Sequence, residues 1–179
     1  MRRLNVAAML AGGIALGAAL GAGVPLAAQR IGGYQGTPED FMQISQLFSL
    51  YSYTIDNHDG VAWADTFAPD GVFQDPSWCA KGRDELIKIV GRNPEMGHDI
   101  LSHHTPELGP IFYQDRDHAA VRSTLVTYRQ RGPGKPDGGV NMTGVYEDKL
   151  VRVNGRWLFA HRTVDRLSAT PSIACSAKP

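Results

Sequence analysis

The hydrophobic pattern of this chain changes its period near residue 100, and this change constrains the fold more than any other feature. Before it, apolar residues recur every three or four positions, as on one face of a helix: Phe41, Ile44, Phe48, Tyr51 and Ile55. After it, four segments are rich in Val, Thr, Tyr, Phe and Ile, near 101–114, 118–131, 140–153 and 156–167. Helices followed by antiparallel strands predict an α+β fold, with amphipathic helices packed on one curved sheet and a pocket between the layers.

Local signals place several elements more finely. Thr37 and Pro38 open a helix that runs to about Asn57, because threonine caps helices, proline fits the first turn, and acidic residues there favour the positive helix end. The sequence also predicts a short helix at 61–67, a short strand at 72–75 and a third helix that begins at 81–85. Asn154-Gly155 is the strongest hairpin signal.

The N-terminal residues form a pattern typical of export. A positive start at residues 1–3 precedes an uncharged apolar run over 6–24, and Pro25 and small residues follow as in a cleavage region. We predict a signal peptide at 1–28, a linker at 29–36, a domain at 37–167 and a C-terminal tail at 168–179. The apolar run is long enough to span a bilayer, so an uncleaved anchor is the alternative and the only expected membrane contact. Either reading places the domain in the periplasm or outside the cell.

The charge balance bears on the expected partners, and the cysteine content bears on a disulfide. The chain has 18 Lys and Arg against 18 Asp and Glu, with no basic stripe, so nucleic acid is not an expected partner. Its two cysteines, Cys79 and Cys175, would lie in an oxidising compartment, which favours a disulfide between them. Two separately buried thiols are the alternative.

Five local patterns occur in a characteristic order. They are Tyr53 to Asp59, Trp63 to Val72, Lys81 to Glu85, Ser102-His103-His104, and Gly155 to Phe159 with Arg162. Their order and spacing over residues 37–167 resemble the SnoaL-like branch of the nuclear transport factor 2-like superfamily, and within it the scytalone dehydratase clade. The resemblance implies a cone-shaped α+β barrel, in which N-terminal helices pack on a curved antiparallel sheet that encloses a pocket. It also suits a homodimer or homotrimer.

The resemblance implies a catalytic pair as well. In that clade, and in the related hexachlorocyclohexane dehydrochlorinase, an aspartate late in the first helix orients a histidine of the sheet, which acts as a general base in an elimination. Asp56 falls on the aspartate position and His104 fits the histidine best, with His103 as the one-residue alternative. A carboxylate that accepts from one imidazole nitrogen fixes the tautomer and leaves the other nitrogen basic near neutral pH. We therefore predict a cofactor-independent lyase that acts on a small cyclic or aromatic molecule.

The chain departs from these relatives elsewhere. Where scytalone dehydratase has a second pocket histidine and a Ser/Asn pair, this chain has Arg129, Gly144 and Tyr146. The lysine and cysteine of the dehydrochlorinase have no counterpart. We expect the base to be retained while the substrate and the acid differ.

Further residues are candidates for substrate binding: Tyr53, His103, Tyr128, Asn141, Tyr146 and His161. Tyr51 lies on the apolar stripe and is predicted to belong to the core. His161 is predicted to share a strand face with Phe159, as a core histidine or a pocket group, whereas Arg162 is predicted to point to the opposite face as a surface or structural residue.

Other chemistries lack support in the sequence. No nucleotide fingerprint or nucleophile motif is present, so we expect no cofactor. His98, Asp99, His103 and His104 could suggest a metal site, but no helical His-x-x-x-His pair supports one, so we expect no metal. Three alternatives stay open. The first is a non-catalytic protein that binds a small hydrophobic ligand, with Asp56 and His104 too far apart to hydrogen-bond. The second is a structural or interaction domain whose pocket is filled by side chains. The third is an isomerase or epoxide hydrolase on the same fold.

Overall fold

A computed structural model describes residues 33–76, 78–91, 101–130 and 138–166. The helices are α1 (Pro38–Asp56), α2 (Gly60–Ala64) and α3 (Arg83–Gly91). The strands are β1 (Phe67–Asp75), β2 (Trp78–Lys81), β3 (Leu101–Glu107), β4 (Ile111–Tyr113), β5 (His118–Gln130), β6 (Gly139–Val153) and β7 (Arg156–Arg166). None of the helices in these ranges is long and apolar enough to cross a membrane.

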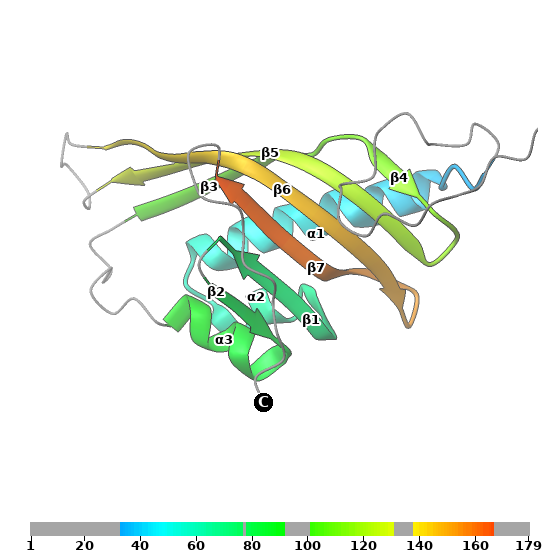
Figure 1. Ribbon diagram of the computed structural model, residues 1–179, viewed down its shortest axis with the longest axis horizontal. Coiled ribbons are helices and arrows are strands. Elements are labelled where there is room, and N and C mark those ends of the chain that lie inside the picture. The colour runs from blue at the N-terminus through cyan, green and yellow to red at the C-terminus, as the bar shows by residue number, and fades with distance from the viewer. Residues whose placement is uncertain (1–32, 77, 92–100, 131–137, 167–179) are drawn as a thin grey trace, which may run out of the picture. The chain divides into compact units, whose positions relative to one another are not determined.

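The strands form one curved sheet in the order β2-β1-β7-β6-β5-β3, and β4 also pairs with β5 (Figure 1). The helix α1 runs along one face of this sheet and contacts β3 and β7, while α2 and α3 pack together and α3 contacts β1 and β2. The predicted α+β fold is thus confirmed. One part of the prediction is wrong: β1 runs parallel to β7, so the sheet is mixed rather than antiparallel. Segments so far apart in sequence carry no local signal of their relative direction.

The first helix begins and ends where the sequence places it. The side chain of Thr37 accepts from the backbone N–H of Asp40, and the Asp40 carboxylate accepts from the backbone N–H of Thr37, which together form a capping box. Asn57 caps the other end. Most of the predicted apolar stripe turns inward, since Ile44 and Tyr51 have no exposed surface, but Phe41 in the first turn is 56% exposed.

The core lies between α1 and the inner face of the sheet, and Tyr51 is at its centre. Its ring lies 5.5 Å from that of Trp63, 6.2 Å from Phe67 and 5.6 Å from Phe159. Burying each of these rings contributes about 1.5–3 kcal/mol. The prediction that Tyr51 belongs to the core is confirmed.

A one-residue bulge in β7 changes which side chains face the core. Phe159 and His161 lie opposite consecutive residues of β6, so Ala160 between them has no partner there. Because successive strand residues face opposite ways, the bulge places Phe159 and Arg162 on the inner face and His161 on the outer one. Both predictions about this strand are therefore wrong: His161 does not share the face of Phe159, and Arg162 does not point away from it.

Three element boundaries differ from the prediction. The short helix α2 ends at Ala64 rather than 67, and β1 begins at Phe67 rather than 72. The segment near 101–114 is divided into β3 and β4, and the sequence did not predict β2. β2 is held by its pairing with β1.

Candidate active site

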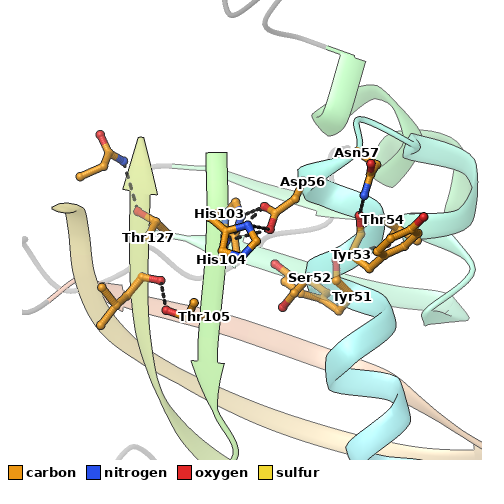
Figure 2. Close-up of polar contacts among 12 residues, drawn as sticks. Tyr51, Ser52, Tyr53, Thr54, Asp56, Asn57, His103, His104, Thr105 and Thr127 are labelled. Carbon is orange, nitrogen blue, oxygen red and sulfur yellow. Dashed lines mark hydrogen bonds and ion pairs between the residues drawn. The ribbon is translucent and has the colours of Figure 1, made fainter. Parts of the chain in front are cut away.

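The C-terminal end of α1 presents Asp56 to the two adjacent histidines of β3 (Figure 2). The Asp56 carboxylate accepts from the backbone N–H of His104 at 2.9 Å and contacts its ring Nδ1 at 2.5 Å. One carboxylate thus fixes both the backbone and the ring of His104. With Nδ1–H donating to Asp56, the imidazole keeps its free lone pair on Nε2, which has no hydrogen-bond partner among the described residues.

The pair is partly shielded from water. The side chains of Asp56 and His104 are 10% and 18% exposed, whereas that of His103 is 75% exposed. His103 Nδ1 lies 3.4 Å from the other carboxylate oxygen, a looser contact. His104 is therefore the histidine that Asp56 orients, and His103 lies at the solvent side of the same carboxylate.

The β3–β5 register places His104 on the inner layer of the molecule. His104 lies directly opposite Thr127, whose side chain is buried, and His103 lies opposite Tyr128. Since residues directly opposite each other share a face of the sheet, His104 faces α1. The predicted base and its orienting acid come from two elements 48 residues apart.

Three of the predicted binding residues are exposed. Tyr53 is 68% exposed and Tyr128 46% exposed. Asn141 is also exposed, and its side-chain amide donates to Thr127 at 3.3 Å. None of the three contacts Asp56 or His104 through a hydrogen bond in the part of the chain that the structure describes. Their binding roles stay predictions.

His161 lies away from this pair. Its Nε2 is 3.0 Å from the Gln74 side-chain oxygen, on the outer face of the sheet. Burial lowers the pKa of His161, and the nearby charge of Lys149 lowers it further, so the imidazole is neutral at pH 7. His161 is a hydrogen-bonded structural histidine rather than a member of the Asp56 site.

Tyr146 belongs to a second buried group, which sequence reasoning missed. Arg162 has no exposed surface, and its Nε and Nη2 donate to the Asp148 carboxylate at 2.7 and 2.8 Å. The guanidinium carbon lies 4.0 Å from the centre of the Tyr146 ring and 4.2 Å from that of Tyr51. Burial opposes the charge of Arg162, but Asp148 outweighs it and holds the pKa of Arg162 above its usual range. One signal was available: Asp148 alternates with the buried Tyr146 and Leu150 in β6, an inward position that requires a partner.

Comparison with known proteins assigns the chain to a family. A model of the SnoaL-like domain matches residues 37–163. This chain belongs to the SnoaL-like family. No curated protein was found to match significantly.

Solved structures agree with this SnoaL-like assignment. A variant of Rv3472 from Mycobacterium tuberculosis, a protein of unknown function, is 27% identical; the match covers 77% of this chain and 82% of that one, with a TM-score of 0.61. A candidate scytalone dehydratase from Novosphingobium aromaticivorans is 24% identical over 79% and 93% of the chains, with a TM-score of 0.62. A Catenulispora acidiphila protein in complex with S-DNPA is 23% identical over 73% and 95%, with a TM-score of 0.63. The last two show the fold alone.

Some predicted features of this SnoaL-like chain lie outside the described residues. Cys79 is on β2, but Cys175 is not among them, so the disulfide stays a prediction. His98 and Asp99 are also outside. Within the described ranges no group of three His, Cys, Asp or Glu side chains could hold a metal ion.

Proposed function

We propose that this SnoaL-like protein is a cofactor-independent lyase, of the dehydratase or elimination type, that acts on a small cyclic or aromatic molecule. The observation that carries the proposal is the double contact of Asp56 with the backbone and ring of His104. The alternative of a non-catalytic binding protein expects Asp56 and His104 to be too far apart to hydrogen-bond. The contact between them therefore favours the enzyme. The fold neighbour described as a candidate scytalone dehydratase points the same way.

The chemistry follows from the orientation of the imidazole. His104 Nε2 takes a proton from a substrate carbon, and the C–H electron pair forms a C=C bond as a hydroxide leaves the adjacent carbon. The imidazolium, stabilised by the Asp56 carboxylate, then returns its proton to the departing oxygen, so water is released. Isomerisation would use the same base but return the proton to another carbon of the substrate.

The test is a substitution of His104 by Ala, with His103→Ala as a matched control on the same strand. A library of hydroxylated cyclic and aromatic ketones in D₂O reports base activity in two ways, by loss of water from the product mass and by deuterium in recovered substrate. His104→Ala should lower both by about 10²-fold or more. His103→Ala should retain most of the activity. Equal rates for wild type and His104→Ala on a turned-over substrate would refute the base.

We also propose that the domain acts after export and carries a Cys79–Cys175 bridge. The support is the N-terminal pattern of residues 1–28 and the even cysteine count. Protein recovered from the periplasm or medium should begin after residue 28 and bind no alkylating reagent until it is reduced. Uptake of two alkyl groups by the unreduced, unfolded chain would contradict the bridge.

A further inference from the structure

The outer edge of β3 is a place where another strand could add to the sheet. The sheet ends in β3 on one side and in β2 on the other. β2 has four residues, whereas β3 has seven, and the pairing of β3 with β5 is regular from Leu101 to Glu107. A strand of that length at a sheet edge turns a row of N–H and C=O groups towards any other chain, so proteins usually block such edges.

Alternation along β3 identifies the residues that point to this edge. In an antiparallel ladder, the backbone groups of one residue point to the partner strand and those of the next residue point away. The backbone N–H of His104 donates to Asp56 at 2.9 Å, so it points away from β5. Figure 2 shows Asp56 on the side of β3 opposite to Thr127 of β5. Because the ladder is regular, Ser102 and Pro106 point to the same edge as His104.

Two of these three positions offer no donor to an added strand. The Asp56 carboxylate occupies the N–H of His104, and Pro106 has no N–H. Ser102 alone of the three keeps an amide hydrogen for a new partner. An added strand would have to displace Asp56, and its carbonyl oxygen would then leave the carboxylate, whose side chain is only 10% exposed, without the N–H that it now accepts from.

We propose that Asp56 has a second role, in which its carboxylate and Pro106 together close the β3 edge against pairing with β3 of a second copy of this chain. An antiparallel strand can pair with its own copy about a two-fold axis, because the edge donors of each strand then face the edge acceptors of the other. This role needs only the contact of Asp56 with the backbone of His104. It therefore does not rest on the proposed lyase.

Amide exchange measures whether Asp56 holds the edge donor. Asp56→Ala removes the acceptor, so the backbone amide of His104 should exchange at least about tenfold faster than in the wild type. Asp56→Asn is the matched control, because its side-chain oxygen can still accept, and it should keep the His104 amide protected. Equal exchange rates in the wild type and Asp56→Ala would overturn the role of the carboxylate.

Opening the edge should make the protein self-associate. The double variant Asp56→Ala/Pro106→Val frees one edge N–H and restores another, and valine suits a strand. Light scattering at equal concentration should report a mass at least twice that of the wild-type species. Pro106→Val alone should keep the wild-type mass, because Asp56 still occupies the N–H of His104. A double variant with the wild-type mass would overturn the proposal.

A third substitution separates edge pairing from misfolding. Ser102→Pro removes the remaining edge donor and costs no hydrogen bond to β5, since the N–H of Ser102 points away from that strand. Added to the double variant, it should restore the wild-type mass, or the wild-type solubility if the double variant precipitates. Association or precipitation that persists in the triple variant would come from another surface and would overturn the assignment to the β3 edge.

The two roles of Asp56 can fail separately. Asp56→Asn should lose turnover while its His104 amide stays protected and its mass stays that of the wild type. Turnover that survives in Asp56→Asn would refute the proposed base pair and leave the edge role standing. Association of Asp56→Asn/Pro106→Val to the same extent as Asp56→Ala/Pro106→Val would refute the edge role instead.

Discussion

Asp40 and Asp56 lie near opposite ends of α1, and their surroundings differ in polarity, in partners and in what those partners do. Asp40 sits in the first turn, where the helix dipole favours negative charge, and its side chain is 2% exposed. It accepts from Tyr34 at 2.5 Å and from Trp157 at 3.1 Å, and it pairs with Arg152. The contacts with Arg152 and Trp157 join the start of the helix to β6 and β7, two central strands of the sheet.

Asp56 lies in the last turn, where the same dipole disfavours a carboxylate. Its contacts are with His104 and, more loosely, His103. A buried charge that satisfies local helix preferences supports the fold, whereas one that opposes them and contacts an imidazole is a candidate for chemistry. The comparison therefore separates a structural aspartate from a functional one on a single helix.

The largest effect expected from this comparison is on turnover. Asp56→Asn should lower the rate by about 10²-fold or more, because an amide cannot stabilise the imidazolium as a carboxylate does. The free energy of unfolding should change by less than about 1 kcal/mol, since the amide oxygen still accepts from the backbone of His104 and the unfavourable dipole term is removed. Turnover and urea unfolding measure the two quantities. Asp115→Asn, in the exposed pair of Asp115 with His118, is the matched control and should change neither.

Asp40→Asn should show the reverse pattern. Removing the carboxylate leaves Arg152 without its buried partner and weakens the hydrogen bonds from Tyr34 and Trp157, so unfolding should become easier by about 2–3 kcal/mol. The folded fraction should retain its turnover per molecule. A large loss of turnover in fully folded protein would contradict the division of roles.

The pH dependence of the unfolding free energy separates the contribution of the Asp40 charge from that of its packing. Burial opposes its ionisation, but hydrogen bonds from Tyr34, Trp157 and Thr37 outweigh burial and hold the pKa of Asp40 well below its usual range. A carboxyl whose pKa is depressed in the folded state stabilises the protein above its unfolded pKa of about 3.9, and this stabilisation is lost as the pH falls towards the folded pKa. The difference in unfolding free energy between wild type and Asp40→Asn should therefore be constant from pH 7 to 5 and shrink below about pH 4. A difference that does not change with pH would assign the effect to packing.

The sequence predicted the local parts of both helix ends but few of their distant partners. The cap at Thr37 and the end near Asn57 follow from residue type and helical period, and the structure has both. Two partners of Asp40, Arg152 and Trp157, lie 112 and 117 residues away, and no local rule pairs them with it. Only the family resemblance pairs Asp56 with His104, since the two residues lie 48 positions apart.

The position of Arg162 shows most clearly what the sequence pattern does not predict. Strict alternation along β7 turns it away from Phe159, and the bulge at Ala160 reverses its direction. A bulge of this kind depends on how two strands fit together, so neither strand's own pattern reveals it. The buried Arg162–Asp148 pair could therefore not be derived from periodicity.

The smallest expected effect concerns the cap that adjoins Asp40. Thr37→Ala removes the hydroxyl that accepts from the Asp40 backbone but leaves the Asp40 carboxylate with Tyr34, Trp157 and its ion pair. It should cost about 1 kcal/mol in urea unfolding, and Thr37→Ser, which keeps the hydroxyl, should restore most of that. A cost equal to that of Asp40→Asn would mean that Asp40 acts chiefly through the capping box. The N-terminal end of α1 would then be stabilised locally, and the link from Asp40 to the sheet would contribute little.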